Sequence, residues 1–348
     1  TAVSLTISPL AGSATDGSAG FVGDGDYDPT DVSTFTAAAD WDGSAGIIGT
    51  GAVTVISETV VEIDETFTIA ITASNPGDVD AADVDVSVVA TTTITNDDSA
   101  TISITTAASL TETNAATTHA FTINSSADVQ TNGTGFTIRA SLAEGTATDA
   151  TAITFIGDGD YDDASFENTA WNGDSGSAII SGSVAINGDT IVELDETFNI
   201  QINPDGAGAT DSDLAGLNVA LAAPQTVTIT NDDSATISIS TAASLVETDA
   251  ATTHAFTVSS DADIQTNGTT FTIRVGQTDG TATSGSAFVG DGDYTNETFT
   301  YAGWNGDSGA GTIGGDNVAI NGDTIVELDE TFDIQINPDG AGATDSDL

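Results

Sequence analysis

One acidic segment is written three times in this chain, and this repetition restricts what the chain can fold into. It reads ETVVEIDETF at residues 58–67 and DTIVELDETF at residues 189–198 and 323–332, and each copy follows a DGDY segment. Successive copies begin 131 and 134 residues apart (58 to 189, 189 to 323). This spacing exceeds most solenoid periods and matches one domain per repeat, so we predict tandem domains.

The repeat divides the chain into three units. Unit one spans residues 1–98 and lacks its first two strands, unit two spans 99–233 and is complete, and unit three spans 234–348 and lacks its last strand. We therefore expect the sequence to be a window on a longer array. The alternative is a subunit that strands from its neighbours complete in a filament.

Strand patterns dominate every unit. ATISI, HAFTI, FTIRA and TFNIQI alternate apolar with polar residues, and pairs of Gly, Asn and Asp separate them. Period-two alternation between such turn signals predicts strands. About seven short strands in each unit predict an all-β chain of tandem antiparallel β-sandwiches of immunoglobulin-like outline.

The charge of the chain is almost entirely of one sign. Asp and Glu number 54 against 2 Lys plus Arg, which gives a formal net charge of −52. Such charge opposes compaction, but 39% hydrophobic residues in alternating positions can still build cores. We exclude nucleic acid and anionic membranes as partners and expect no membrane insertion. Because there is no Cys, metal ions are the available staple.

The repeated carboxylates predict a cation site at one end of each unit. Calcium takes six to eight oxygen ligands, and loops at one end of a sandwich bring distant segments together. Several acidic loops there would repel one another without a cation. The alternative is that the Asp residues of DGDY and NDD form turns in a salt-adapted protein, because Asp side chains bond to nearby backbone.

The combined motifs carry a family resemblance. A Glu after the first strand, then GTAT and DY, then GDTIVELDETF and TITNDD together resemble the Calx-beta domain of sodium–calcium exchangers, an integrin β subunit and many bacterial surface proteins. The resemblance covers essentially the whole chain. It implies a seven-stranded sandwich whose distal loops bind calcium cooperatively.

Carried over by position, the resemblance implies calcium ligands in all three units. In unit two they are Glu112, Asp160, Asp189, Glu193, Asp232 and Asp233. In unit three they are Glu247, Asp293, Asp323 and Glu327. In unit one they are Asp26, Glu58, Glu62, Asp97 and Asp98. Glu58 stands where the other units have Asp, and NDD runs into Ser where the family often has a third Asp.

Two features depart from the family pattern. They are the WNGDSG segments at 171–176 and 304–309 and the insertion at 205–225, and we expect both to be contact surfaces. In an adhesin interpretation these Trp loops or the insertion would grip cell-surface glycans or another cell. In the structural interpretation the Trp residues pack the end of a sandwich or a neighbouring repeat.

The few basic side chains recur at fixed strand positions. His119 and His254 are equivalent, as are Arg139 and Arg274. We predict structural roles for them, with the Arg pairing with a buried carboxylate. No nucleophile with a matching base is recognisable, so we expect no enzyme.

These observations together predict a calcium-binding structural module of an extracellular surface or filament protein, in which calcium stiffens the domains and their junctions. Calcium and copies of the chain are the expected partners. The alternatives are the adhesin and a calcium sensor.

Overall fold

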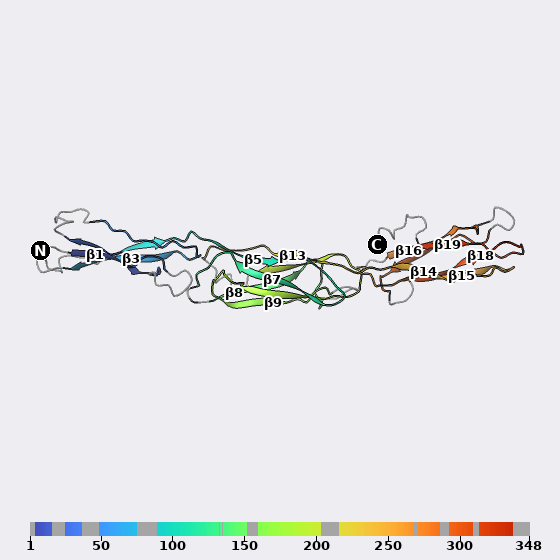
Figure 1. Ribbon diagram of the computed structural model, residues 1–348, viewed down its shortest axis with the longest axis horizontal. Helices are drawn as coiled ribbons and strands as arrows, with labels where there is room; N and C mark the ends of the chain where they lie inside the picture. Colours follow the sequence, from blue (N-terminus) through green and yellow to red (C-terminus); the bar gives the residue numbers. More distant parts are fainter. Residues whose placement is uncertain are drawn as a thin grey trace.

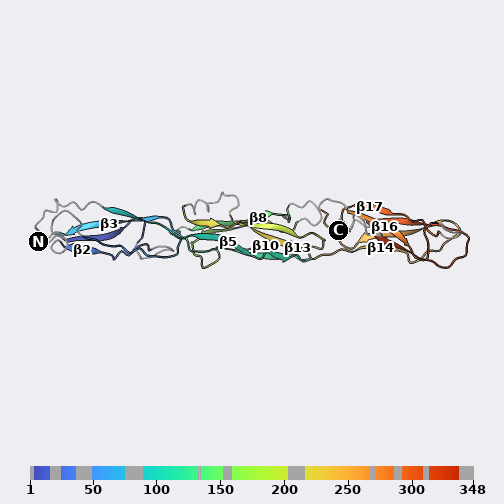
Figure 2. The same cartoon turned by 90° about the horizontal axis from the view of Figure 1, so that it is seen from above.

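The protein is a row of β-sheet units. The computed structural model describes residues 4–15, 25–36, 49–74, 89–131, 133, 135–151, 159–202, 216–266, 271–285, 292–308 and 313–336. All regular elements in these ranges are strands, and Figures 1 and 2 show the three groups following one another along the long axis. No helix long and apolar enough to cross a membrane occurs in these ranges.

Unit two forms a complete sandwich. One sheet has the order β10-β7-β5-β12 and the other the order β6-β13-β11-β8-β9. Their strands are β5 (Ala100–Thr106), β6 (Ser109–Thr111), β7 (Thr117–Ser125), β8 (Phe136–Glu144), β9 (Ser165–Trp171), β10 (Ile180–Ile186), β11 (Glu196–Ile202), β12 (Val219–Leu221) and β13 (Gln225–Thr230). The pairs β12–β5 and β13–β6 are parallel, and the other pairs are antiparallel.

The inner faces of these two sheets share one core. Ile123 of β7 and Ile138 of β8 are fully buried, as are Phe198 and Ile200 of β11. Burial alternates along β11, as the sequence pattern predicts for a strand with one inward face. Burial of each such side chain stabilises the fold by roughly 1.5–3 kcal/mol. The strands and their sheets confirm the prediction of an all-β chain of tandem sandwiches.

Unit three repeats this arrangement with fewer strands. Its sheets have the orders β14-β15-β18 and β17-β16-β19. The strands are β14 (Ile237–Thr241), β15 (Thr252–Ser260), β16 (Phe271–Asp279), β17 (Phe299–Trp304), β18 (Gly314–Ile320) and β19 (Phe332–Ile336). Val258, Ile273 and Val275 fill the core between them.

Unit one contributes one sheet of order β2-β1-β3-β4 to the described part of the chain. Its strands are β1 (Ser4–Ala11), β2 (Ser33–Thr36), β3 (Glu65–Ser74) and β4 (Ala90–Ile94). A small core forms where Tyr27 stacks on Phe67, with ring centroids 5.1 Å apart. Tyr161 stacks on Phe198 in the same way in unit two, at 5.0 Å.

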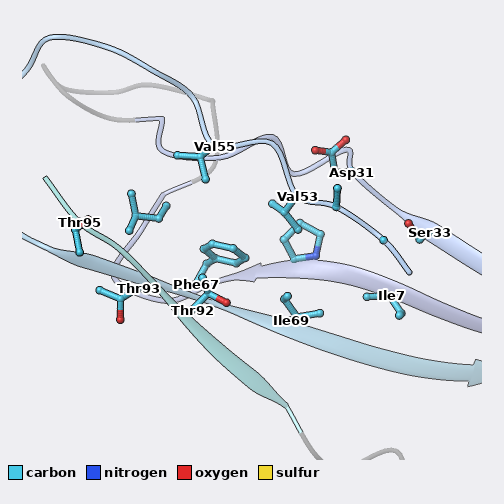
Figure 3. A pocket seen from close by; sticks show the side chains of 14 residues that line it. Ile7, Asp31, Ser33, Val53, Val55, Phe67, Ile69, Thr92, Thr93 and Thr95 are labelled. Carbon is cyan, nitrogen blue, oxygen red and sulfur yellow. The ribbon is translucent and has the colours of Figure 1, made fainter. Parts of the chain in front are cut away.

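The inner face of this sheet lines a cavity of about 600 Å³, in which Ile7, Val53, Phe67 and Ile69 surround the opening (Figure 3). Val55 at its rim is 50% exposed. The equivalent residue of unit two, Ile186, is fully buried, because β7 pairs with its strand and completes the second sheet. Among the described residues, no second sheet packs on this inner face.

The recurrent basic residues have the structural roles that we predicted, with one correction. The imidazole Nε2 of His119 lies 2.6 Å from Thr106 Oγ1, and His254 repeats this contact with Thr241 at 2.6 Å. The prediction that Arg139 pairs with a buried carboxylate is wrong. Arg139 lies on the outward face of β8 and pairs at 3.1 Å with Glu167, whose side chain is 40% exposed.

Part of the expected contact surface at 205–225 is paired in a sheet. Residues 219–221 form β12, which runs parallel to β5, and Asn218 Nδ2 donates to the Asp98 carbonyl oxygen at 3.0 Å. Residues 205–215 and Trp41 lie outside the described residues.

Candidate metal centre

The second Asp of each DGDY segment is held beside the acidic repeat. Asp160 is 5% exposed, and its Oδ2 accepts hydrogen bonds from the backbone N–H of Thr148 at 2.6 Å and from Thr148 Oγ1 at 3.3 Å. Asp26 and Asp293 are held in the same way, by Thr15 and Thr283. These bonds join residues 10 to 12 positions apart, so they are not local turn bonds, and they fix where each carboxylate stands.

Unit one brings three predicted ligands together. Asp26, Glu58 and Glu62 each offer one oxygen, and these atoms lie within 4.8 Å of one another. Asp26 comes from the DGDY turn, whereas the two Glu residues stand four positions apart in the segment that leads into β3. Burial, followed by the charges of Asp26 and Asp98, raises the pKa of Glu58.

Unit three forms a corresponding trio from Asp293, Glu327 and Glu330, again within 4.8 Å. Glu330 was not among the predicted ligands. Its equivalents Glu65 and Glu196 are 5% and 7% exposed. Of the remaining predicted ligands of this unit, Glu247 Oε1 accepts the backbone N–H of Asp323 at 3.3 Å. Burial, followed by the charges of Asp323, Asp293 and Glu247, raises the pKa of Glu327.

Unit two gathers four predicted ligands into one electrostatic group, although no trio of its described carboxylates meets the same 4.8 Å limit. Burial, followed by the charges of Asp160 and Glu112, raises the pKa of Glu193 to about 9. Burial, followed by the charge of Asp189, raises the pKa of Glu112 to about 7. Each of these carboxylates makes its neighbours harder to ionise.

The same crowding acts in unit one, where burial and then the charges of Glu58 and Asp26 raise the pKa of Glu62 to about 9. A group with this pKa holds its proton at neutral pH unless a cation replaces the proton. The clusters therefore offer cations a site for which protons compete.

The Asn of each NDD segment bonds to the backbone of the last Asp of that segment. Asn231 Nδ2 donates to the Asp233 carbonyl at 3.1 Å, and its Oδ1 accepts the Asp233 N–H at 3.2 Å. Asn96 makes the same pair of bonds with Asp98. Asp233 Oδ2 is buried and accepts no hydrogen bond from the described residues. The middle Asp residues, Asp97 and Asp232, are exposed.

Each of the first two clusters lies at the joint with the following unit. Val61 forms a parallel β-bridge to Val129, and Val192 forms one to Ile264. At the first joint, Val61 N–H donates to the Asp128 carbonyl and Gln130 N–H donates to the Val61 carbonyl, both at 2.9 Å. The acidic segment of one unit is thus backbone-bonded to a loop of the next.

The WNGDSG segments fold onto the same loops. Trp171 Nε1 donates to the Asp174 carbonyl at 3.0 Å, Val129 N–H donates to the Gly173 carbonyl at 2.9 Å, and Ser175 N–H donates to Asp128 Oδ1 at 2.7 Å. Trp304 is arranged in the same way in unit three. Trp171 and Trp304 are only 4% and 8% exposed, so they pack the ends of the sandwiches and present no open ring face.

The donor set suits a hard cation. Every candidate ligand in the clusters is a carboxylate oxygen, and the described residues place no His or Cys among them. Calcium prefers such oxygens and accepts irregular arrangements of six to eight of them. The buried Asp233 Oδ2 is an acceptor that a cation would satisfy. The residues present therefore fit calcium.

No protein-family description matches this chain, and no curated protein matches it. Among solved structures, the crystal structure of CBD12 from CALX1.2 is similar at 16% identity, covers 68% of this chain and 80% of its own, and has a TM-score of 0.25. The apo-form Calx CBD1 domain is 17% identical, covers 38% of this chain and 98% of its own, and has a TM-score of 0.24. Similarities at these TM-scores establish neither a shared function nor a shared ligand.

Proposed function

We propose that this protein is a calcium-binding structural repeat module of an extracellular surface or filament protein, in which calcium stiffens the units and their joints. The observation that carries this proposal is the position of Glu62 and Glu193. Each stands in a cluster of carboxylates, and each directly follows the valine that bridges to the next unit. A cation there would act on the cluster and on the joint together.

The charge of the chain gives the cation a structural role. With a net charge of −52 and no disulfides, the acidic ends of the units repel one another. A divalent ion at each cluster would remove that repulsion where two units meet. Extracellular calcium sites typically bind at ~10⁻⁴–10⁻³ M, and at about a hundredfold excess over Kd each site would add roughly 2.7 kcal/mol.

The adhesin alternative has less support. It needs an exposed aromatic platform, whereas the side chains of Trp171 and Trp304 are buried, and residues 219–221 of the 205–225 insertion are paired in a sheet. We infer a structural role rather than a catalytic one, because the buried His119 is bonded within its sheet. The carboxylates are accounted for by cation binding.

Calcium titration of the chelated full chain tests the proposal. We expect saturable heat release and a rise in melting temperature, together with a narrower distribution of end-to-end lengths in small-angle scattering. Sodium chloride of equal ionic strength is the control, because screening alone also weakens repulsion between exposed charges. If calcium raises the melting temperature no more than sodium chloride does, the proposal is wrong.

A further inference from the structure

A glutamine from the following unit enters each acidic cluster at a joint. Gln130 Nε2 lies 3.2 Å from Glu62 Oε1, and Gln265 Nε2 lies 3.5 Å from Glu193 Oε1. The two glutamines are equivalent and are 4% and 9% exposed. The same arrangement at both joints indicates a built feature of the repeat.

The backbone fixes these glutamines in place. Gln265 N–H donates to the Val192 carbonyl at 2.9 Å, while Val192 N–H donates to the Asp263 carbonyl at 2.9 Å. Ile264, between them, donates its N–H to the Gly306 carbonyl at 2.8 Å. Because the backbone of the glutamine and of Ile264 is bonded, the glutamine side chain starts from a fixed point beside the cluster.

At the second joint the carboxamide of Gln265 has a buried oxygen available as a ligand. Gln265 Oε1 is buried and accepts no hydrogen bond from the described residues. A buried acceptor left without a partner is costly, typically about 1–3 kcal/mol. An amide oxygen is an ordinary calcium ligand, and it adds a donor to the cluster without adding another negative charge.

We propose that the cation sites at the two joints are each shared between two units, with Gln130 and Gln265 supplying a ligand oxygen to the cluster of the preceding unit. The inference rests on the proposed calcium binding. It makes cation binding and docking of the next unit one linked equilibrium, in which each strengthens the other by the same factor.

Unit three provides the internal reference. The described residues place no glutamine beside Glu327, and Val326, the equivalent of the bridging Val61, is 97% exposed whereas Val61 is fully buried. Sharing of the joint sites between units predicts two classes of calcium site in one chain. The two joint sites bind calcium tightly, and the site of unit three binds it weakly.

The test is calorimetric titration of calcium into the full-length Gln130→Leu/Gln265→Leu variant. We expect the tight class to weaken about 10–100-fold, the effect that support residues of metal sites commonly show, and the weak class to stay unchanged. Gln225→Leu is the matched control, because Gln225 is exposed and lies outside the clusters.

The Gln130→Glu/Gln265→Glu variant separates a ligand from a merely structural contact. It keeps the oxygen and adds charge, so we expect calcium affinity equal to or above that of the parent and a lower melting temperature in chelator. If the Leu variant binds as the parent does, or the Glu variant loses binding as the Leu variant does, the sharing is wrong. If the parent itself binds no calcium, the proposed function fails instead.

Discussion

Replacing Gly173 by Ala should open the first joint. Gly173 has φ +86°, and an added Cβ would stand 1.8 Å from the Val129 carbonyl oxygen. The left-handed conformation alone costs Ala roughly 1–2 kcal/mol. No side-chain rotation can relieve this contact, because the backbone fixes the positions of both the added Cβ and the carbonyl oxygen.

The second part of the effect is the lost bond. Moving the two segments apart breaks the hydrogen bond from Val129 N–H to the Gly173 carbonyl, which contributes about 0.5–1.5 kcal/mol net. Gly216→Ala is the control, since Gly216 has φ +90° and a Cβ added there would meet no atom of the described residues within 4 Å. We expect the two variants to differ by about 1–2 kcal/mol in the free energy of opening the first joint, and this difference measures how strongly the joint is held.

Native-state hydrogen exchange measures the free energy of opening at the joint itself. A melting temperature would average over all three units. For about 1–2 kcal/mol, we expect the amides of Val61, Val129 and Gln130 to exchange roughly 5–30 times faster in Gly173→Ala than in Gly216→Ala. Equal protection in the two variants would show that the WNGDSG segment does not hold the joint.

Two further predictions concern the clusters. The pKa of Glu62 and of Glu193 is raised to about 9, so the folded chain holds protons that the unfolded chain has released; without calcium, its melting temperature should fall as pH rises from about 5 to 9. Calcium must displace these protons, so the calcium-induced rise in melting temperature should grow over the same window, and a flat profile in chelator would contradict the assigned crowding. Asp160→Asn keeps an acceptor for Thr148 N–H but removes a charge, so we expect weaker calcium binding by calorimetry with an unchanged or higher melting temperature in chelator. Asp163→Asn, at an exposed position, is its control, and equal calcium affinity in the two variants would exclude Asp160 as a ligand.

The strands and the cluster near DGDY could be predicted because their signals are local. Alternation of period two places Phe198 and Ile200 inward, and the fixed spacing of the repeats marks the same turn in each unit. The same alternation also carried a signal that was overlooked. Glu196 precedes Phe198 by two positions, so it shares the inward face, and this parity could have identified Glu330 of unit three as a member of the trio.

The joint could not be predicted in the same way. Glu62 and Gln130 are 68 positions apart and belong to different units, and their contact depends on how two folded units meet. The WNGDSG segment indicated only that this part of the chain departs from the family pattern. Nothing local indicates that Gly173 bonds to Val129, because neither segment has a periodic pattern that would require the other.

The choice of glutamine at the joint follows from the charge of its surroundings. Glu62 already shares its site with Glu58 and Asp26, and burial together with their charges raises its pKa. A carboxylate at position 130 would add repulsion between two units and push them apart whenever the cation is absent. An apolar side chain would remove the repulsion but leave Glu62 without a donor. A carboxamide avoids both costs, because its N–H₂ donates to Glu62 and it adds no charge. The joint can therefore stay closed in low calcium and tighten when calcium binds.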